Sequence, residues 1–267
     1  MQPLDKTLRN QLDRTVRKAR PVAEQAAEAA LEQLGVGEES APSYLNDGQR
    51  ALRRRLRAHA RSLGDPLQEG AQSITRLISE IAYEHWHRML FARFLAENEL
   101  LMYDGVAVTL EECEELAEEE GHPSGWALAA QLASTMLPQV FRVDSPVFEV
   151  TLAAEYQREL EDLLAELAVE VFHASDSLGW VYQFWQTDNK ERINRSEVKI
   201  GADELPAVTQ LFTEPYMVSF LLDNSLGAWW AARRLSETDL ANAESELELR
   251  DKASLPGVPL EYLRFVQ

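Results

Sequence analysis

The sequence of 267 residues has one cysteine and no apolar run that approaches the roughly 18 residues needed to span a bilayer. A single cysteine cannot build a disulfide framework. The opening residues, MQPLDKTLRN, also lack the apolar stretch of a secretion signal. We therefore expect a cytoplasmic protein without a membrane segment. Cys113 lies among carboxylates, which raise the pKa of a thiol, so it is not expected to act as a nucleophile.

Positive charge is also scarce, with 26 Lys and Arg against 45 Asp and Glu and a net charge of −19. Residues 1–61 hold 12 basic and 8 acidic residues and carry +4, which leaves −23 for the rest. Phosphate binding depends on Lys and Arg that displace counterions, so a chain this acidic should not coat nucleic acid. Any contact with DNA is expected from a local basic strip or from another part of a larger protein.

The spacing of the hydrophobic residues indicates a mainly α-helical fold. Leu8, Leu12 and Val16 begin one helical pattern, which Pro21 is expected to kink or break. The apolar surface of residues 72–101 is too broad for an exposed helix, so this segment should lie centrally in a bundle. Its two histidines, at positions 85 and 87, point away from each other on a helix, so no metal site is expected.

Residues 49–66, QRALRRRLRAHARSLGDP, predict a second helix with leucines near one side. Five arginines cover most of its other faces: Arg53, Arg54, Arg55, Arg57 and Arg61. Such a run is typical of a solvated face or of a contact with an acidic partner. The alternative is a strip that binds the phosphate backbone of DNA.

Aromatic residues are dense in LGWVYQFWQ, residues 178–186. This density favours a buried junction between domains, and stacking on nucleic-acid bases is the alternative. A polar and basic loop is expected to follow. Its basic residues, which could contact phosphates or an acidic partner, are Lys190, Arg192, Arg195 and Lys199.

The segment TEPYMVSFLLDN, residues 213–224, predicts a helix with Thr213 as its N-cap. Threonine is a good N-cap, Pro215 is tolerated in the first turn, and an early glutamate complements the helix dipole. Free backbone N–H groups at such a start attract a carboxylate or a phosphate.

Several segments closely resemble the region just upstream of the catalytic core in large adenine-N6-specific DNA methyltransferases of bacterial phage defence. These are the PglX enzymes of BREX and the related methyltransferase of class 1 DISARM. The segments are LGWVYQFWQ, NKERIN, GADELPAVTQLFTEPYMVSFLLDNSLGAWW and ASLPGVPLEYLRFV, and upstream LDRTVRKAR and AYEHWHRMLFARFLAENELL also look similar. The resemblance implies a multi-helix N-terminal bundle, followed by helices that pack on a downstream Rossmann-like methyltransferase core outside this chain.

In this family the segment around QLFTEPYMV lies against the methionine end of S-adenosylmethionine. The resemblance therefore implies Phe212, Thr213, Pro215 and Tyr216 as cofactor-side residues. Many relatives have Thr-Pro directly, whereas Glu214 intervenes here, although the spacing from threonine to tyrosine is kept.

Methyl transfer in such enzymes also needs a Gly-rich turn for the cofactor and an (N/D)PP(Y/F) loop that holds the flipped adenine. Neither motif is found: GDPLQEG lacks the strand and the glycine spacing, and TEPYM has one proline. We expect a fragment without catalytic residues that is inactive alone. S-adenosylmethionine is expected only for the full-length enzyme, with no cofactor bound to this chain alone.

We expect a basic helical region in residues 1–70, a central bundle in 71–186, and a linker with further helices in 187–267. The expected partners are double-stranded DNA, bound weakly, the downstream methyltransferase domain and other phage-defence proteins. Two alternatives stay open. One is a stand-alone acidic protein-interaction module, and the other is a DNA-mimicking inhibitor, which the charge of −23 outside residues 1–61 motivates.

Overall fold

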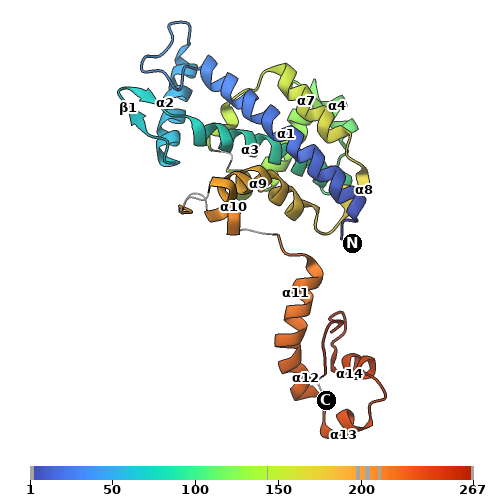
Figure 1. Ribbon diagram of the computed structural model, residues 1–267. Helices are drawn as coiled ribbons and strands as arrows, with labels where there is room; N and C mark the ends of the chain where they lie inside the picture. Colours follow the sequence, from blue (N-terminus) through green and yellow to red (C-terminus); the bar gives the residue numbers. More distant parts are fainter. Residues whose placement is uncertain (1–2, 143, 197–198, 202–204, 210–211, 266–267) are drawn as a thin grey trace. The chain divides into compact units, whose positions relative to one another are not determined.

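The computed structural model describes residues 3–142, 144–196, 199–201, 205–209 and 212–265 (Figure 1). It is mainly helical, which confirms the predicted fold class. The chain divides into two compact units, Met1–Glu197 and Val198–Gln267. The predicted boundaries at residues 70 and 186 both fall inside the first unit.

The first unit contains long helices joined by short turns. Its helical elements are α1 (Lys6–Gln33), α2 (Asp47–Ser62), α3 (Thr75–Glu97), α4 (Leu110–Ala117), α5 (Gly125–Met136), α6 (Pro138–Phe141), the 3-10 turn η1 (Pro146–Glu149), α7 (Ala154–Ala165), α8 (Val169–His173) and α9 (Ser177–Ser196). Two antiparallel hairpins complete it: β1 (Leu67–Gln68) with β2 (Ala71–Gln72), and β3 (Met102–Tyr103) with β4 (Val106–Ala107).

Helix α3 is the centre of the first unit, as its sequence predicts. It packs against α1, α5, α7 and α8, and α1 and α3 lie side by side (Figure 1). Trp86, Ile81 and Leu77 on α3 are completely buried. The facing side of α1 is a stripe of alanines and β-branched or leucine side chains, so the two backbones can approach closely.

The expected break at Pro21 is wrong, because α1 continues through it as one helix. Proline removes a backbone N–H and ordinarily costs a helix interior about 3 kcal/mol. Here Pro21 is exposed, while Val16 and Ala23 on either side are completely buried. The packing of the buried face therefore outweighs the local preference of one residue.

Helix α9 also differs from the sequence prediction, because the expected loop after Gln186 is the last part of this helix. Trp180 and Trp185 are buried inside the first unit rather than at a junction between domains. Trp185 stacks on Trp86 with ring centroids 6.4 Å apart. The indole N–H of Trp180 donates to Asp176 at 3.0 Å. These two rings are covered, so they offer no platform for bases.

The second unit is smaller. Its elements are α10 (Leu205–Thr209), α11 (Pro215–Leu222), a π-helical turn η2 (Asp223–Gly227), α12 (Ala228–Arg234), α13 (Glu237–Asn242) and α14 (Glu246–Ala253). Ala231, Ala253, Leu260 and Leu263 form its core. The indole N–H of Trp230 donates to the Ala253 carbonyl at 2.9 Å, which joins α12 to α14.

The turn η2 holds the last described residues in place. The buried carboxylate of Asp223 accepts from the Tyr262 amide at 2.9 Å. Asn224 donates to the Tyr262 carbonyl at 2.7 Å and accepts from the Arg264 amide at 3.0 Å. Two segments that carry the family resemblance, DNSLGAWW and LEYLRF, are therefore joined by hydrogen bonds and by a shared core. Among the described helices, none combines the length and hydrophobicity that crossing a bilayer demands.

Replacing Pro21 with alanine should stabilise the protein. Alanine restores the missing helix N–H at an exposed position, and we expect the free energy of unfolding to rise by about 1–3 kcal/mol after allowing for the more flexible unfolded chain. Urea unfolding followed by circular dichroism measures this change. Gln25→Ala, one turn further along the exposed face, is the control and should change stability by less than about 0.5 kcal/mol. A destabilised Pro21→Ala protein would contradict this account of α1.

Candidate nucleic-acid and cofactor surfaces

Arg53 lies inside the first unit and not on a basic face. Its side chain is 7% exposed. The guanidinium donates to the backbone carbonyl oxygens of Gly35 at 2.8 Å and of Glu38 at 2.5 Å. A buried guanidinium held by two carbonyl groups fastens the loop after α1 onto α2. In this arrangement Arg53 cannot contact a phosphate.

Arg57 and Arg61 hold the same loop and the first hairpin. Arg57 donates to the carbonyl oxygens of Val36 at 2.7 Å and Gly70 at 2.9 Å. Burial, together with the neighbouring cations, lowers the pKa of Arg57 from its usual value. Arg61 donates to the side-chain carbonyl of Gln72 at 3.1 Å. Arg57 and Arg61 therefore donate hydrogen bonds to groups of the protein itself.

Only part of the arginine run stays available on α2. Arg54 is exposed, and within the described part of the chain it has no ion-pair or hydrogen-bond partner. Arg55 is also exposed and pairs with Glu149 of η1. Arg61 is exposed as well, although it donates to Gln72. The strip predicted from five arginines is thus reduced to Arg54, Arg61 and the ion pair of Arg55.

The basic residues near the end of α9 form the stronger cationic surface. Arg192 and Arg195 are exposed, and Lys190 is partly exposed. Arg195 pairs with Glu191, one turn earlier, at 2.8 Å, a geometry that is weak in water. Lys199, the fourth predicted residue, is exposed and belongs to the second unit.

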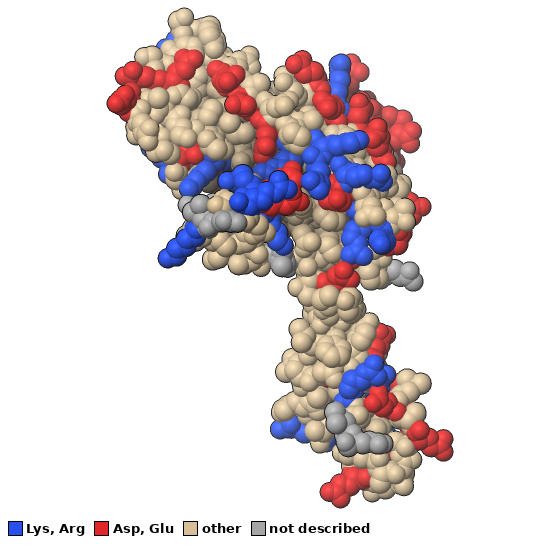
Figure 2. Space-filling view, viewed as in Figure 1, with Lys and Arg blue, Asp and Glu red and all other residues tan. Residues whose placement is uncertain are grey.

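Helix α1 adds cations that the sequence analysis did not assign to this surface. Arg17 pairs with Asp188 of α9 at 3.1 Å. With Arg192 and Arg195 it lines a shallow hollow between the two helices. Figure 2 shows Lys and Arg gathered on the face of the first unit where α1 and α9 lie. The signal in the sequence was the basic run RTVRKAR, but its link to α9 required knowledge of the packing.

The predicted N-cap at Thr213 is wrong, because α11 begins at Pro215 with Glu214 as its N-cap. A residue before proline favours an extended backbone, and Glu214 has φ −59° and ψ 138°. Pro215 then occupies the first helical position, where proline is favoured. Thr213 therefore lies outside the helix and is exposed.

The predicted cofactor-side residues lie on an open surface of the second unit. Phe212 is partly buried, Pro215 partly exposed and Tyr216 49% exposed. No residue of α11 is buried. Tyr216 and three further α11 side chains line an apolar hollow with Tyr262. Thr213 and α11 are thus not enclosed in a core. The role suggested by the family resemblance requires such an open position.

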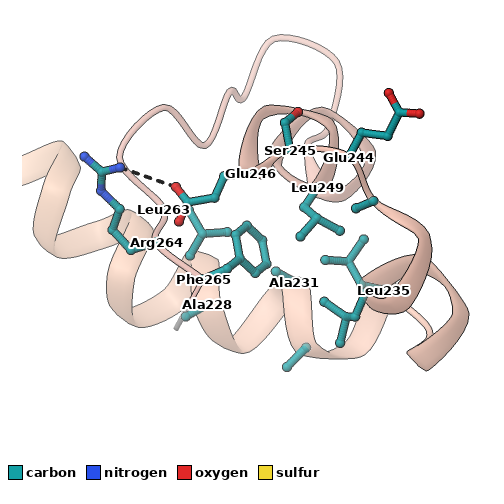
Figure 3. A pocket seen from close by; sticks show the side chains of 13 residues that line it. Ala228, Ala231, Leu235, Glu244, Ser245, Glu246, Leu249, Leu263, Arg264 and Phe265 are labelled. Atoms are coloured by element: carbon teal, nitrogen blue, oxygen red, sulfur yellow. Dashed lines mark hydrogen bonds and ion pairs between the residues drawn. The ribbon is translucent and has the colours of Figure 1, made fainter. Parts of the chain in front are cut away.

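A second hollow in this unit, of about 690 Å³, lies between α12 and α14 (Figure 3). Ala231, Leu249 and Leu263 contribute to its apolar lining. An ion pair between Arg264 and Glu246, 3.3 Å long, closes one edge. The sequence carries no local signal for this hollow, because residues from three separate segments line it.

No group of three or more His, Cys, Asp or Glu in the described part of the chain could hold a metal ion. His85 is buried with its Nε2 3.2 Å from the Val147 carbonyl oxygen, and burial lowers its pKa to about 4. Burial also lowers the pKa of His87, whose ring stacks on Tyr83. Burial and the nearby Glu112 raise the pKa of Cys113 to about 11, so its thiol stays protonated at neutral pH.

The described elements define a helical protein with a cationic face on one unit and an uncovered apolar helix on the other. No protein-family model matches the chain, and no solved structure matches it significantly. Two curated proteins are similar to it. Adenine-specific methyltransferase PglX of Lacticaseibacillus casei (strain Zhang) is 26% identical over 222 residues, which cover 67% of this chain and 18% of the relative. Adenine-specific methyltransferase BrxX of Escherichia coli O9:H4 (strain HS) is 34% identical over 71 residues, 27% of this chain and 6% of the relative.

The resemblance to PglX-type adenine-specific methyltransferases is thereby confirmed. The matched part of the chain spans less than a fifth of the length of either relative.

Substitution of Arg53 should cost stability, whereas substitution of Arg54 should not. Arg53→Gln removes two charge-assisted hydrogen bonds from a buried position, so we expect a loss of about 2–4 kcal/mol in the free energy of unfolding. Arg54→Gln should change it by less than about 0.5 kcal/mol. Urea unfolding of both variants gives the comparison. Equal stability of the two variants would contradict the structural role of Arg53.

Proposed function

We propose that this chain is an N-terminal helical module of a site-specific adenine-N6 DNA methyltransferase of bacterial phage defence, an enzyme that marks self DNA. The module supports DNA and partner engagement and does not itself catalyse methyl transfer. The similarity to PglX over 67% of the chain carries this proposal. The lack of a Gly-rich turn and of an NPPY-like loop in these 267 residues supports the non-catalytic role.

In this proposal, DNA contact is local and weak. The cations available are Arg192 and Arg195 on α9, with Lys190 beside them and Arg17 on α1. Asp188 and Glu191 line the same hollow and pair with Arg17 and Arg195, so a backbone phosphate would displace these weak surface pairs and contact Arg192, which is unpaired among the described residues. Each such contact releases counterions. The net charge of −19 opposes wider contact, so the protein is expected to bind duplex DNA without base recognition and only at low salt.

The second unit serves a protein partner, the methyltransferase domain. Helix α11 has no basic residue and presents Met217, Phe220 and Leu221 to solvent, at 42%, 45% and 64% exposure. Uncovered apolar side chains at this density are typical of a docking face. S-adenosylmethionine is the methyl donor in this proposal, with Phe212 and Tyr216 on one wall of its pocket and the domain supplying the other.

Charge reversal tests the DNA surface. The double variant Arg192→Glu/Arg195→Glu should bind duplex DNA more weakly at low salt and lower the slope of log affinity against log salt by about two. Fluorescence anisotropy with a labelled duplex over a salt series measures both. Arg158→Glu/Arg233→Glu changes net charge equally at exposed positions on other elements and is the control. An equal loss in this control would mean that net charge, not the α9 surface, governs binding.

Reconstitution tests the role of α11. The chain alone should neither methylate DNA nor bind S-adenosylmethionine at micromolar affinity in calorimetry. Supplied with the methyltransferase segment of the PglX relative, in trans or fused, it should support adenine methylation.

Phe220→Ser/Leu221→Ser should abolish this support, because it removes the apolar contact. Leu240→Ser/Leu247→Ser replaces two leucines that are equally exposed, on α13 and α14, and should retain it. Methylation by the chain alone, or equal activity of both double variants, would contradict the proposed role.

A further inference from the structure

The first unit contains a half-open hollow of about 410 Å³ that no feature of the proposed function uses. It lies where α3, α5, α7 and the segment after η1 meet. Phe148, Trp126 and Met89 line it together with polar groups from α3 and α7. Its volume falls within the range of about 300–1,000 Å³ that is usual for small-molecule sites.

Arg88 makes this hollow unusual. Its guanidinium lies over the Phe148 ring, with Cζ 4.7 Å from the ring centroid. Its Nε is buried and has no hydrogen-bond partner among the described residues. The buried arginines elsewhere in this unit, Arg20, Arg53 and Arg93, each donate to backbone carbonyl oxygens. This covered Nε is out of a ligand's reach, so contact with a ligand falls to the terminal nitrogens of the guanidinium.

The nearest carboxylate does not neutralise Arg88. Glu84 stands one turn earlier on α3, but its ion pair is with Arg142 at 3.4 Å. Burial lowers the pKa of Arg88 and Glu84 raises it, yet the side chain remains charged at neutral pH. Arg88 is partly buried, so it loses part of its hydration, and no carboxylate among the described residues forms an ion pair with it.

The rest of the lining keeps the hollow positive. Arg158 of α7 is exposed and, in the described part of the chain, has no ion-pair partner. Glu161, the carboxylate on the wall, accepts a hydrogen bond from Gln157 at 3.0 Å. His85 is neutral at pH 7, since burial lowers its pKa to about 4. Two cations against one carboxylate give a local excess of positive charge in a chain whose net charge is −19.

We propose that this hollow is a binding site for a small anion carried on a flat apolar body, with Arg88 as its counter-charge and Phe148 and Trp126 as its apolar walls. The planar guanidinium offers paired donors to a carboxylate or a phosphate. The Phe148 and Trp126 side chains offer apolar contact to an aromatic group. The site is independent of the DNA surface on α9 and of α11.

The test uses the full chain and three probes with the same phenylethyl body: 3-phenylpropanoate, 2-phenylethylphosphonate, which stands in for a phosphate, and the neutral 3-phenylpropanamide. Calorimetry should detect binding of at least one anion at millimolar affinity or better, and at least tenfold weaker binding of the amide. Whichever anion binds more tightly identifies a carboxylate or a phosphate as the natural group. No binding of either anion at about 10 mM would overturn the proposal.

Arg88→Met separates a binding role from a structural one. It should weaken anion binding at least tenfold while Tm stays equal or rises, because a partly buried charge without an ion pair is replaced by an apolar side chain. Arg54→Met, at an exposed arginine on α2, should leave binding and Tm unchanged.

A lower Tm for Arg88→Met would mean that Arg88 holds the fold, and unchanged anion binding would mean that it does not hold the ligand. Either result overturns the proposal. Arg88→Lys keeps the charge without the planar donors and should bind the anion with intermediate affinity.

Discussion

The guanidinium of Arg20 joins α9 to α1, and the arrangement of the first unit depends on it. It donates to the Trp185 carbonyl at 2.6 Å, to Asn189 at 3.1 Å and to Glu24 at 2.9 Å. These bonds fix the position of α9 along the axis of α1. In this position the Trp185 ring stacks on Trp86 of the central helix α3. The cationic surface follows from the same contact, because α9 continues past Asn189 and brings its last basic residues alongside α1.

Arginine has two opposite uses in this unit, and burial distinguishes them. Arg53 and Arg93 are held by backbone carbonyl groups that no helix or strand satisfies, which suits a side chain with several donors in one plane. Arg192 and Arg195 face water, where their charge costs little and can meet a phosphate. Composition counts all four alike, so a basic run in the sequence overstates the surface available to DNA.

The fold could be predicted further than the surfaces could. The broad apolar pattern of α3 predicted its central place correctly, because many of its side chains independently require burial. Pro21 and Thr213 were interpreted from local preference alone. Tertiary packing overrides it at Pro21, and the proline at position 215 overrides it at Thr213. The burial of Arg53 could not be predicted from the sequence, since its carbonyl partners lie 15 and 18 residues away along the chain.

Two neighbouring tryptophans show that the helices of the second unit are packed on one side and uncovered on the other. Trp230 donates its N–H to the Ala253 carbonyl and packs on the small core. Trp229 is 57% exposed, and the Cζ of Arg233 lies 3.8 Å from the centroid of its ring. The packing of α12 is thus complete on one side only, and α11 continues with no buried residue. A phosphate surface requires cations, and α11 has none. The free energy available from covering this face is therefore that of apolar burial, which a protein surface supplies and a DNA backbone does not.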